Sequence, residues 1–359
     1  MANRLFDLNE TKGTFQVRGI VSGVEKDSFF TEKKTTTGKT RRQINFGIHY
    51  ENDGFLYVGL NGMEQDVVYV SKREDDGTTT VDKVNWEDRF SLEEGFTPIG
   101  TRVGLKKVED RNGHFKNEVK TLHSFDACKY VAENLKDGMS VYVSGNIEYS
   151  SFTTPQGEKR NSVKLNIGRI FLCDHDIDLD SLDEASESNK PVDDFEQRIV
   201  FMGIEKEKKD DVETNRAIVS AKIVSYNSID DAEFILPNIS QQKAFLKNLR
   251  NLHPYTSIDI FGKIVGNIEE ETVEDEDDGW GGPNPMARIN RPYTREFIIV
   301  GAVKTSIDET LYNEENVTAA INSVNNSKKA DKDFGTVKTV DSDDGWGGTM
   351  DINDEDDDW

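Results

Sequence analysis

Two stretches of this chain, Ser140-Val-Tyr-Val-Ser-Gly145 and Ser257-Ile-Asp-Ile-Phe-Gly262, share a Ser, a Gly and two β-branched positions at a constant offset of 117 residues. In both stretches apolar residues occupy every second position, which is the period of a β-strand with one buried face. A strand that recurs at a fixed offset indicates that the elements around it recur as well.

A helical pattern precedes each of these strands. Residues 124–135 and 240–252 carry apolar side chains at helical spacing, and Asp137-Gly138 ends the first pattern. The apolar positions are Phe125, Cys128, Val131, Ala132 and Leu135 in the first helix, and Phe245, Leu246, Leu249 and Leu252 in the second.

Alternating, β-branched-rich segments predict the remaining strands. Gly19 in the first of them is expected to be a bulge or kink. Gly168 and Gly301 align the two closing strands at an offset of 133, and the 16 additional residues correspond to an acidic insertion before the last strand. Strands are expected at 15–24, 42–50, 54–60, 140–149 and 162–172, then at 197–205, 217–226, 232–236, 257–262 and 297–303, with weaker strands of an insertion at 67–72, 79–86 and 101–108.

The order of three strands, a helix and two strands is that of the OB-fold, a five-stranded, partly open Greek-key barrel. Another small barrel or a ferredoxin-like unit is the alternative, but the latter needs a helix after the first strand. Chance recurrence of Gly and Val or Ile is a further competitor, and the shared order argues against it. The sequence therefore predicts a mainly β protein with two tandem OB-fold-like barrels, each with a helix between strands 3 and 4, and a disordered acidic C-terminal tail.

The acidic residues are segregated along the chain. The formal net charge is −24, yet residues 1–172 hold 25 Lys and Arg against 25 Asp and Glu. Residues 174–194 hold nine acidic residues and one basic residue. Residues 269–282 hold eight acidic residues and no basic one, and residues 331–359 hold eleven acidic and two basic residues. Because the excess lies in these three segments, the low isoelectric point does not exclude anion binding by the folded parts.

Composition restricts the class of protein. A chain of 359 residues with 35% hydrophobic and 31% charged residues is long enough for two cores. No apolar stretch reaches 18 residues, and the first eight residues lack the apolar run of a signal peptide. Cys128 and Cys173 lie in apolar patterns, which favours reduced core thiols. We therefore expect a cytoplasmic protein (host cytoplasm if viral) that does not contact a membrane.

The predicted connections carry cations interleaved with aromatic residues, the pattern that tracks phosphates and stacks on bases. The connection between the first two strands, residues 26–42, is the richest; a solvated loop with Phe29 or Phe30 on the barrel is the alternative. For the basic stretch 102–120, the alternative to strand binding is a plain exposed hairpin. For Tyr50 and Tyr57, the alternative is a position in the core or at the rim of the barrel. The expected strand-binding residues are Lys26, Phe29, Phe30, Lys33, Lys34, Lys39, Arg41, Arg42, Tyr50, Tyr57, Arg102, Lys106, Lys107, Tyr149, Phe152, Lys159, Arg160, Arg288, Arg291, Tyr293 and Arg295.

The carboxyl end places five carboxylates before a terminal Trp. A solvated acidic peptide with a bulky ring is suited to capture by another protein. The motif Asp-Asp-Gly-Trp-Gly-Gly occurs at 277–282 and again at 343–348. For the repeated motif, the alternative is low-complexity drift in a disordered segment. For the carboxyl end, the alternative is a random polar tail that happens to stop at Trp. The expected partner-binding residues are Trp346, Asp354, Glu355, Asp356, Asp357, Asp358 and Trp359.

No catalytic or cofactor signature is found. Asp174, Asp176, Asp178 and Asp180 resemble a calcium loop, but Leu179 occupies the glycine position that such a loop requires. The sequence has no phosphate-binding Gly-Lys motif, paired-Cys zinc site or helical His pair. We therefore expect a protein without catalytic residues, metal or cofactor.

With tandem OB-like order, aromatic and cationic loops and the tail at 354–359, the chain resembles single-stranded DNA-binding proteins, especially those of bacteriophages. That resemblance implies coating of single-stranded DNA in replication, recombination or repair, and recruitment of a helicase, polymerase, nuclease or recombinase through the tail. Bacterial members typically end in Pro-Phe and have one OB domain per chain, so the Trp end and the two repeats are departures. The alternative is an acidic adaptor or DNA-mimic inhibitor that never binds nucleic acid. The expected divisions are 1–173 (first domain with inserted strands), 174–195 (acidic linker), 196–306 (second domain with an acidic insertion at 268–287), 307–330 (helix) and 331–359 (tail).

Overall fold

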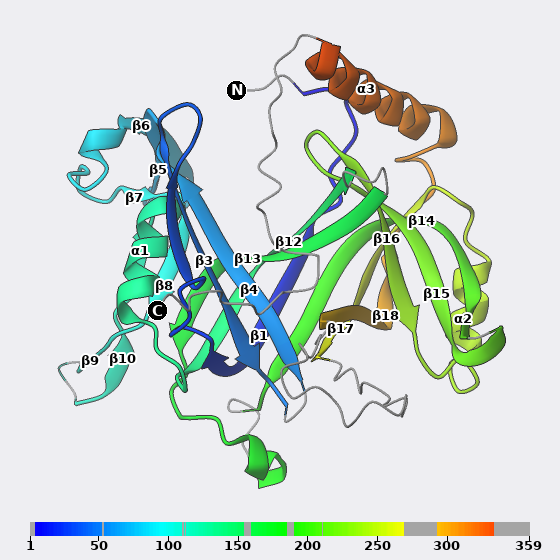
Figure 1. Cartoon of the computed structure of the whole chain (residues 1–359), viewed down its shortest axis with the longest axis horizontal. Coiled ribbons are helices and arrows are strands. Elements are labelled where there is room, and N and C mark those ends of the chain that lie inside the picture. The colour runs from blue at the N-terminus through cyan, green and yellow to red at the C-terminus, as the bar shows by residue number, and fades with distance from the viewer. Residues whose placement is uncertain are drawn as a thin grey trace, which may run out of the picture.

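A computed structural model describes residues 4–51, 54–109, 111, 113–153, 159–184, 190–209, 211–268 and 293–333 (Figure 1). The chain is mainly β, as predicted, with most strands joined in one large sheet. The acidic segment 269–292 and the tail 334–359 lie outside the described residues, and with them the predicted disorder of the tail.

The first unit, residues 13–172, has the predicted order of elements with one strand added. Its elements are β1 (Gly13–Ser22), β2 (Phe30–Lys34), β3 (Thr40–His49), β4 (Phe55–Met63), α1 (Ser124–Asn134), β12 (Ser140–Thr153) and β13 (Lys159–Leu172). β1 pairs with β3 and β12, β3 with β4, and β12 with β13; β13 then meets β4 in a parallel contact at Asn166 and Gly59. The pairings thus run in a ring. The segment predicted as a loop at 26–42 contains β2, which forms a hairpin with β3.

The second unit, residues 192–308, repeats this arrangement. It consists of β14 (Val192–Lys209), β15 (Val212–Val224), β16 (Ile229–Leu236), α2 (Lys243–Arg250), β17 (Thr256–Ile268) and β18 (Tyr293–Asp308). Its pairings follow the same ring, with a parallel contact between Ile235 of β16 and Ile298 of β18. A short 3-10 helix, η2 (Leu179–Glu184), precedes this unit.

The two units are joined by antiparallel pairing of β1 with β14, in which Gly13 lies opposite Gln197. The Gln197 side chain is 1% exposed, and its Nε2 donates to the carbonyl oxygens of Thr11 (3.2 Å) and Arg198 (2.7 Å). A Cβ on residue 13 would lie 1.7 Å from Gln197 Oε1, so any other residue there would displace the Gln197 side chain. One apolar core extends through both units; for example, the ring centres of Tyr149 in β12 and Phe297 in β18 lie 6.2 Å apart.

The repeated glycines mark bulges at matching places. The register shifts between Ser144 and Gly145 in β12 and between Phe261 and Gly262 in β17. A Cβ on either glycine would lie within 2 Å of a carbonyl oxygen of the partner strand. Gly145 pairs with Ile167, and Gly262 with Ile299, so the closing strands correspond at an offset of 132. The predicted offset of 133, which matched Gly168 to Gly301, was wrong by one residue: both closing strands have the bulge, and the residue that corresponds to Gly168 is Val300.

Gly19 has a different role from the predicted bulge. The register of β1 with β12 continues through it without a shift. A Cβ at Gly19 would lie 2.1 Å from the carbonyl oxygen of His49, where β1 passes from β12 to β3. The glycine therefore permits a close crossing of two backbones.

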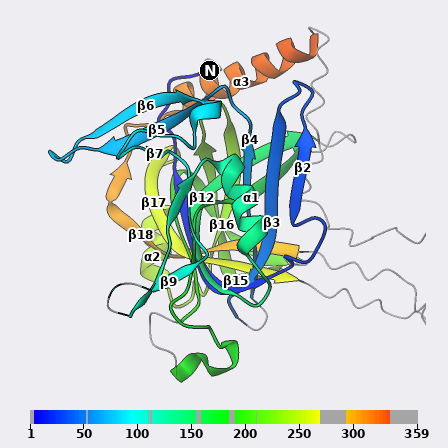
Figure 2. The same ribbon diagram turned by 90° about the vertical axis from the view of Figure 1, so that its left-hand side faces the viewer.

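The insertion between β4 and α1 forms two small sheets, β5–β7 and β9–β10, with β5–β7 as a layer beside α1 (Figure 2), while its strands β8 and β11 extend the main sheet at β13. Its elements are β5 (Val67–Arg73), β6 (Thr79–Asn85), η1 (Trp86–Asp88), β7 (Thr97–Pro98), β8 (Thr101–Gly104), β9 (Lys107–Glu109), β10 (Phe115–Asn117) and β11 (Lys120–Leu122). Arg89 connects this layer to α1, because its guanidinium pairs with Asp126 at 2.8 Å and lies 4.0 Å from the Trp86 ring centre.

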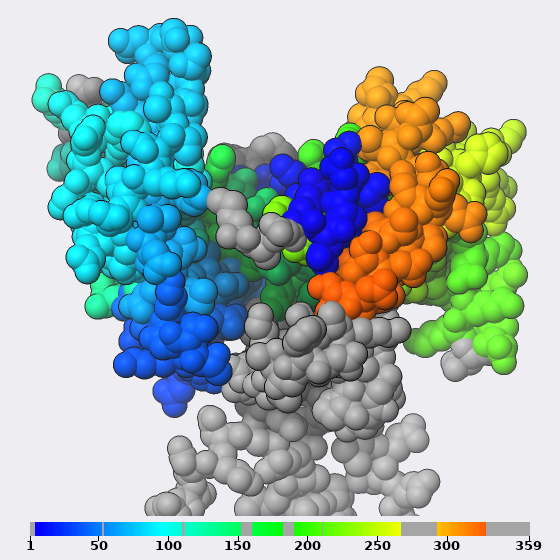
Figure 3. Space-filling model, turned by 90° about the horizontal axis from the view of Figure 1, so that it is seen from above, coloured from blue at the N-terminus to red at the C-terminus, as the bar shows by residue number. Residues whose placement is uncertain are grey.

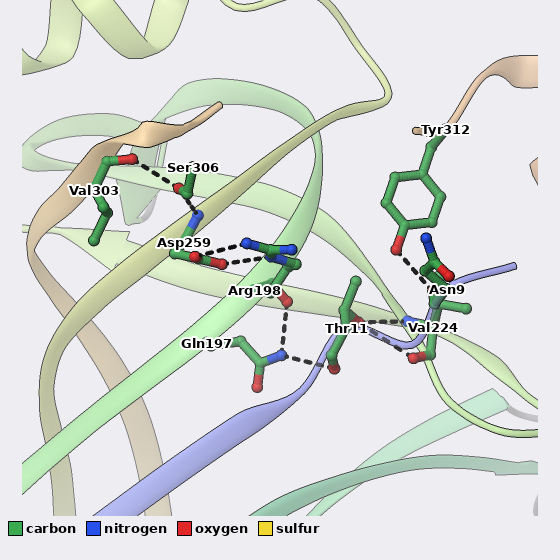
Figure 4. Close-up of polar contacts among 9 residues, drawn as sticks. All are labelled: Asn9, Thr11, Gln197, Arg198, Val224, Asp259, Val303, Ser306 and Tyr312. Carbon is green, nitrogen blue, oxygen red and sulfur yellow. Dashed lines mark hydrogen bonds and ion pairs between the residues drawn. The ribbon is translucent and has the colours of Figure 1, made fainter. Parts of the chain in front are cut away.

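The N-terminal segment 4–11 and α3 (Glu314–Asp333) pack together on the second unit. The Tyr312 hydroxyl donates to the carbonyl oxygen of Asn9 at 2.7 Å, and Thr11 exchanges hydrogen bonds with Val224 (Figure 4). Close by, Arg198 binds Asp259 through two hydrogen bonds of 2.7 and 2.8 Å. These contacts fix α3, and therefore the point from which the tail continues.

The cysteines are free thiols, as expected: Cys128 is buried and Cys173 partly buried. Burial raises the pKa of Cys128 to about 12 and that of Cys173 to about 11, which makes both thiols unreactive. None of the described helices is long and apolar enough to cross a membrane. Within the same residues, no group of three or more His, Cys, Asp or Glu side chains is placed to hold a metal ion.

The junction of the two units gives a test with a matched control. Gly13→Ala should lower the free energy of unfolding by about 1–3 kcal/mol, because Gln197 must leave its hydrogen bonds to admit a Cβ. Gly203→Ala in β14 should be neutral or stabilising by less than about 1 kcal/mol, since no atom lies within 4 Å of its Cβ position. Urea denaturation measures both; equal effects would contradict the role given to Gly13.

Candidate nucleic-acid interface

The outer face of β2, β3 and β4 carries polar and cationic side chains at every second position. On β3 the even residues Ile44, Phe46 and Ile48 are buried, and the odd residues Arg41 and Gln43 point outward with partial exposure. Because the strands are paired in register, the outward residues form rows across the sheet. The rows are Lys33, Arg41 and Met63; then Thr31, Gln43 and Asn61; then Asn45 and Gly59.

Two glycines keep this face flat. A Cβ on Gly47 would lie 2.0 Å from the Phe55 ring, and a Cβ on Gly59 would lie 2.5 Å from the Asn45 amide oxygen. The Phe55 ring and the Asn45 side chain therefore lie across bare backbone. The amides of Gln43, Asn45 and Asn61 offer donors and acceptors to base edges.

An aromatic cluster closes one end of the face. Edge-to-face contacts join Phe55 to His49 (4.7 Å between ring centres) and to Tyr57 (4.6 Å), and Tyr57 to Tyr293 of β18 (5.0 Å). Tyr57 and Tyr293 are partly exposed, so their rings are accessible for stacking. Burial lowers the pKa of His49 below its usual value, which keeps this imidazole neutral at pH 7.

Cations line the opposite end, around the β2–β3 hairpin. Lys33 and Lys34 are exposed and Arg41 is partly exposed, whereas the exposed Lys26 precedes β2, away from the hairpin turn. Lys39 pairs with Asp66 at 2.9 Å, which partly neutralises it. Seen from above, the molecule has a hollow between the part with the insertion and the N-terminal segment with α3 (Figure 3). A surface with cations at one end, amides in the middle and aromatic rings at the other has the chemistry of a single-strand groove.

Another concavity, of about 680 Å³, lies over the junction of β1, β12, β14 and β17. Its lining includes Arg169 and the carboxylates of Asp194 and Glu196, and the Lys263 ammonium there is paired with Asp193 and Asp194 at 2.7 Å. Since carboxylates repel phosphates, this groove is the poorer candidate for a nucleic acid.

A family model, YorF, matches residues 12–336. The chain belongs to the YorF family. Comparison with the curated proteins finds no match.

Solved structures with similarity to this YorF chain include the single-stranded DNA binding protein from Thermus aquaticus. The wild-type structure has 9% identity and a TM-score of 0.36, over 82% of this chain and 93% of that one. The mitochondrial single-stranded DNA binding protein Rim1 of S. cerevisiae has 12% identity and a TM-score of 0.19. This match covers 46% of this chain and 96% of the Rim1 chain. Scores this low transfer neither fold nor function, so the affiliation with bacteriophage proteins stays a prediction.

The corresponding face of the second unit in this YorF chain is different. Its outward residues include Arg216 and Lys222 on β15, and Asp231 and Glu233 on β16. Arg216 pairs with Glu296 at 2.6 Å, and Lys222 with Asp231 at 2.7 Å. The cations of this face are neutralised and its carboxylates are exposed, so the two units are not equivalent toward an anion.

Some predicted strand contacts prove to be buried. Phe29 (5% exposed), Tyr50 (3%) and Tyr149 (5%) have their rings in the core, and burial raises the pKa of Tyr50 to about 12. Stacking on a base requires an open ring face, so the assignment of these three residues as stacking platforms was wrong. Phe30 is partly exposed and packs against the core from β2.

Arg42 was also assigned wrongly, because it lies on the opposite side of β3 from Arg41. Its guanidinium pairs with Glu32 at 2.6 Å and lies 3.8 Å from the ring centre of Phe125 in α1. It therefore attaches the β2–β3 hairpin to α1. Alternation along a strand, the same rule that identified the core residues, separates Arg41 from Arg42.

The other predicted cations fall outside this face or outside the described residues. β13 separates β8 from β4 in the sheet, which places Arg102, Lys106 and Lys107 away from the β2–β3–β4 face. Arg160 is exposed near the end of the β12–β13 hairpin, and Tyr293 and Arg295 lie on β18 beside β4. The side chains that the structure does not describe are Phe152, Lys159, Arg288, Arg291, Trp346, Asp354, Glu355, Asp356, Asp357, Asp358 and Trp359.

Sequence reasoning missed Gln43, Asn45, His49, Asn61 and Met63. The signal was present on β3, where polar residues alternate with Ile44, Phe46 and Ile48. Amide side chains are common on exposed strands, however, and only the pairing with β4 shows that they form rows.

The two neighbouring arginines give a direct test of this assignment. Arg42→Ala should lower the free energy of unfolding by about 1–3 kcal/mol, because it removes a partly buried ion pair and a cation–π contact. Arg41→Ala should change it by less than about 0.5 kcal/mol. Thermal or urea denaturation of both variants checks this. The reverse order of effects would place Arg42 on the outer face.

Proposed function

We propose that this protein binds single-stranded DNA on the β2–β3–β4 face of its first unit, coats and protects the strand in replication, recombination or repair, and recruits partner enzymes through its acidic tail. The observation that carries the proposal is the face itself. It combines cations (Lys33, Arg41), amide rows and partly exposed rings (Tyr57, Tyr293) on a glycine-flattened sheet, and the exposed Lys34 lies at the end of β2 on the other side of the strand. Phosphate contacts and stacking tolerate any base, so binding is expected to be independent of sequence.

We further propose that each unit is an OB-fold. The ring of pairings β1, β3, β4, β13, β12 supports this, as does its repetition in β14, β15, β16, β18, β17. In each ring the third and fifth strands meet in parallel, and a helix lies between the third and fourth strands. The proposed strand-binding face is the one formed by the second and third strands of the first ring.

The tail proposal rests on sequence and on α3. Residues 334–359 hold nine acidic and one basic residue and end in Trp359. Because α3 is anchored to the second unit through Tyr312 and Val317, the tail starts at a fixed place on the body. The terminal ring and its carboxylates are the proposed ligand for a helicase, polymerase, nuclease or recombinase.

Binding is tested by charge reversal of a pair of adjacent exposed lysines in each of two hairpins. Lys33→Glu with Lys34→Glu should reduce affinity for oligo-dT about tenfold or more at low salt, and should lower the slope of log K against log salt by about 1.4, or about 0.7 per lost phosphate contact. The control, Lys208→Glu with Lys209→Glu, changes two exposed lysines at the end of β14 and should have little effect. Fluorescence anisotropy measures both.

Equal losses in the two double variants would contradict a site on the first unit. If the unaltered chain ignored oligo-dT at low ionic strength, the adaptor or DNA-mimic alternative would replace the proposal.

Removal of residues 334–359 tests the tail. The truncated chain should bind oligo-dT several-fold more tightly at low salt, because a net charge of −8 no longer competes with the strand, and the gain should vanish at high salt. Trp359→Ala should abolish capture of a purified partner enzyme without changing oligo-dT affinity. Unchanged affinity and unchanged capture in the truncated chain would reject the tail hypothesis.

A further inference from the structure

The last hairpin of each unit packs against the other unit. We call the contact region between the β12–β13 and β17–β18 hairpins and the units that they reach the seam. The β12–β13 hairpin reaches the second unit, where the Tyr149 ring lies 6.2 Å from that of Phe297. The β17–β18 hairpin reaches the first unit, where the backbone N–H of Gly266 donates to the Tyr50 hydroxyl at 3.2 Å. Arg295 of β18 lies in this seam and donates through Nη2 to the carbonyl oxygen of Val163 on β13.

Three donors in the seam lack partners. Nη1 of Arg295 and the hydroxyls of Tyr149 and Tyr293 are buried, and none of them has a hydrogen-bonding partner among the described residues. Burial lowers the pKa of Arg295, which reflects the loss of water around the charge, and Tyr149 is among the groups nearest to it. No carboxylate of a described residue pairs with this guanidinium.

Other partly buried arginines of this chain have carboxylate partners. Arg89 pairs with Asp126, Arg198 with Asp259 and Arg216 with Glu296, all at 2.6–2.8 Å. An unpaired charge away from water is strongly unfavourable, so a buried guanidinium without a carboxylate needs another anion. The guanidinium and the phenol present donors, and donors select an oxyanion.

We propose that Arg295 Nη1 and the Tyr149 hydroxyl form a binding site for a phosphate group of the nucleic-acid strand. This inference rests on the proposed function. The site adjoins the aromatic end of the β2–β3–β4 face, because Tyr293, two residues before Arg295, contacts Tyr57. A strand whose base stacks at this end has its phosphate within reach of the seam. Since both donors are buried, the two hairpins part to admit the phosphate, and binding therefore connects the units.

The proposal is tested by two properties that should change in opposite directions. Arg295→Met keeps the length of the side chain and removes the charge. It should raise the unfolding midpoint of the free protein, because an unpaired buried charge is gone, and should lower oligo-dT affinity about tenfold, the effect of one charge-assisted hydrogen bond. Tyr149→Phe should lower affinity without lowering the midpoint.

Arg216→Met is the matched control. Because Arg216 has the carboxylates of Glu207 and Glu296 as partners, its loss should lower the unfolding midpoint and leave oligo-dT affinity unchanged. A lower midpoint for Arg295→Met would show that this arginine already has a counter-ion in the free protein and would overturn the proposal. Unchanged affinity in Arg295→Met, with binding by the unaltered chain intact, would overturn the seam site and leave the proposed function standing.

Inorganic phosphate tests the seam site independently of binding to the DNA strand. Phosphate or pyrophosphate alone should raise the unfolding midpoint of the unaltered chain more than that of Arg295→Met. If oligo-dT binding were absent altogether, the proposed function would fall, and this difference alone would decide the seam site. Equal shifts in both proteins would overturn it.

Discussion

The pairing of β1 with β14 is the constraint on which the rest of the structure depends. Gly13 and Gln197 fix its register, because the Gln197 amide occupies the place of a side chain at residue 13 and binds the backbone on both sides. This pairing places two strand rings back to back over one core. Each unit's last hairpin then crosses to the other, so the faces of the two units share residues at the seam.

The two repeats have diverged in charge while keeping their geometry. The β3–β4 face of the first unit presents amides, Arg41 and exposed lysines of the neighbouring hairpin, whereas the β15–β16 face presents ion pairs and carboxylates. Since phosphate contacts supply most of the affinity for a single strand, this asymmetry concentrates binding in the first unit. The second unit contributes Tyr293 and Arg295 and holds α3, from which the acidic tail continues.

The order of elements was predictable, and the side-chain environments were only partly so. Alternation at Ile44, Phe46 and Ile48 and the repeated strand at 140–145 and 257–262 locate strands correctly, because one face of each is buried. The β2 strand escaped prediction since its Lys and Thr residues read as a loop. Tyr149 is buried by a hairpin more than a hundred residues away, which local sequence does not reveal. Gly168 and Gly301 are not equivalent positions, so matching them misaligned the closing strands by one residue.

Photo-crosslinking with halogenated oligo-dT, followed by mass spectrometry of the adducts, tests the central claim most directly. If the β2–β3–β4 face of the first unit binds the strand, adducts will fall within residues 30–63 and at Tyr293. Adducts confined to residues 212–236 of the second unit, or none at low ionic strength, would contradict the account.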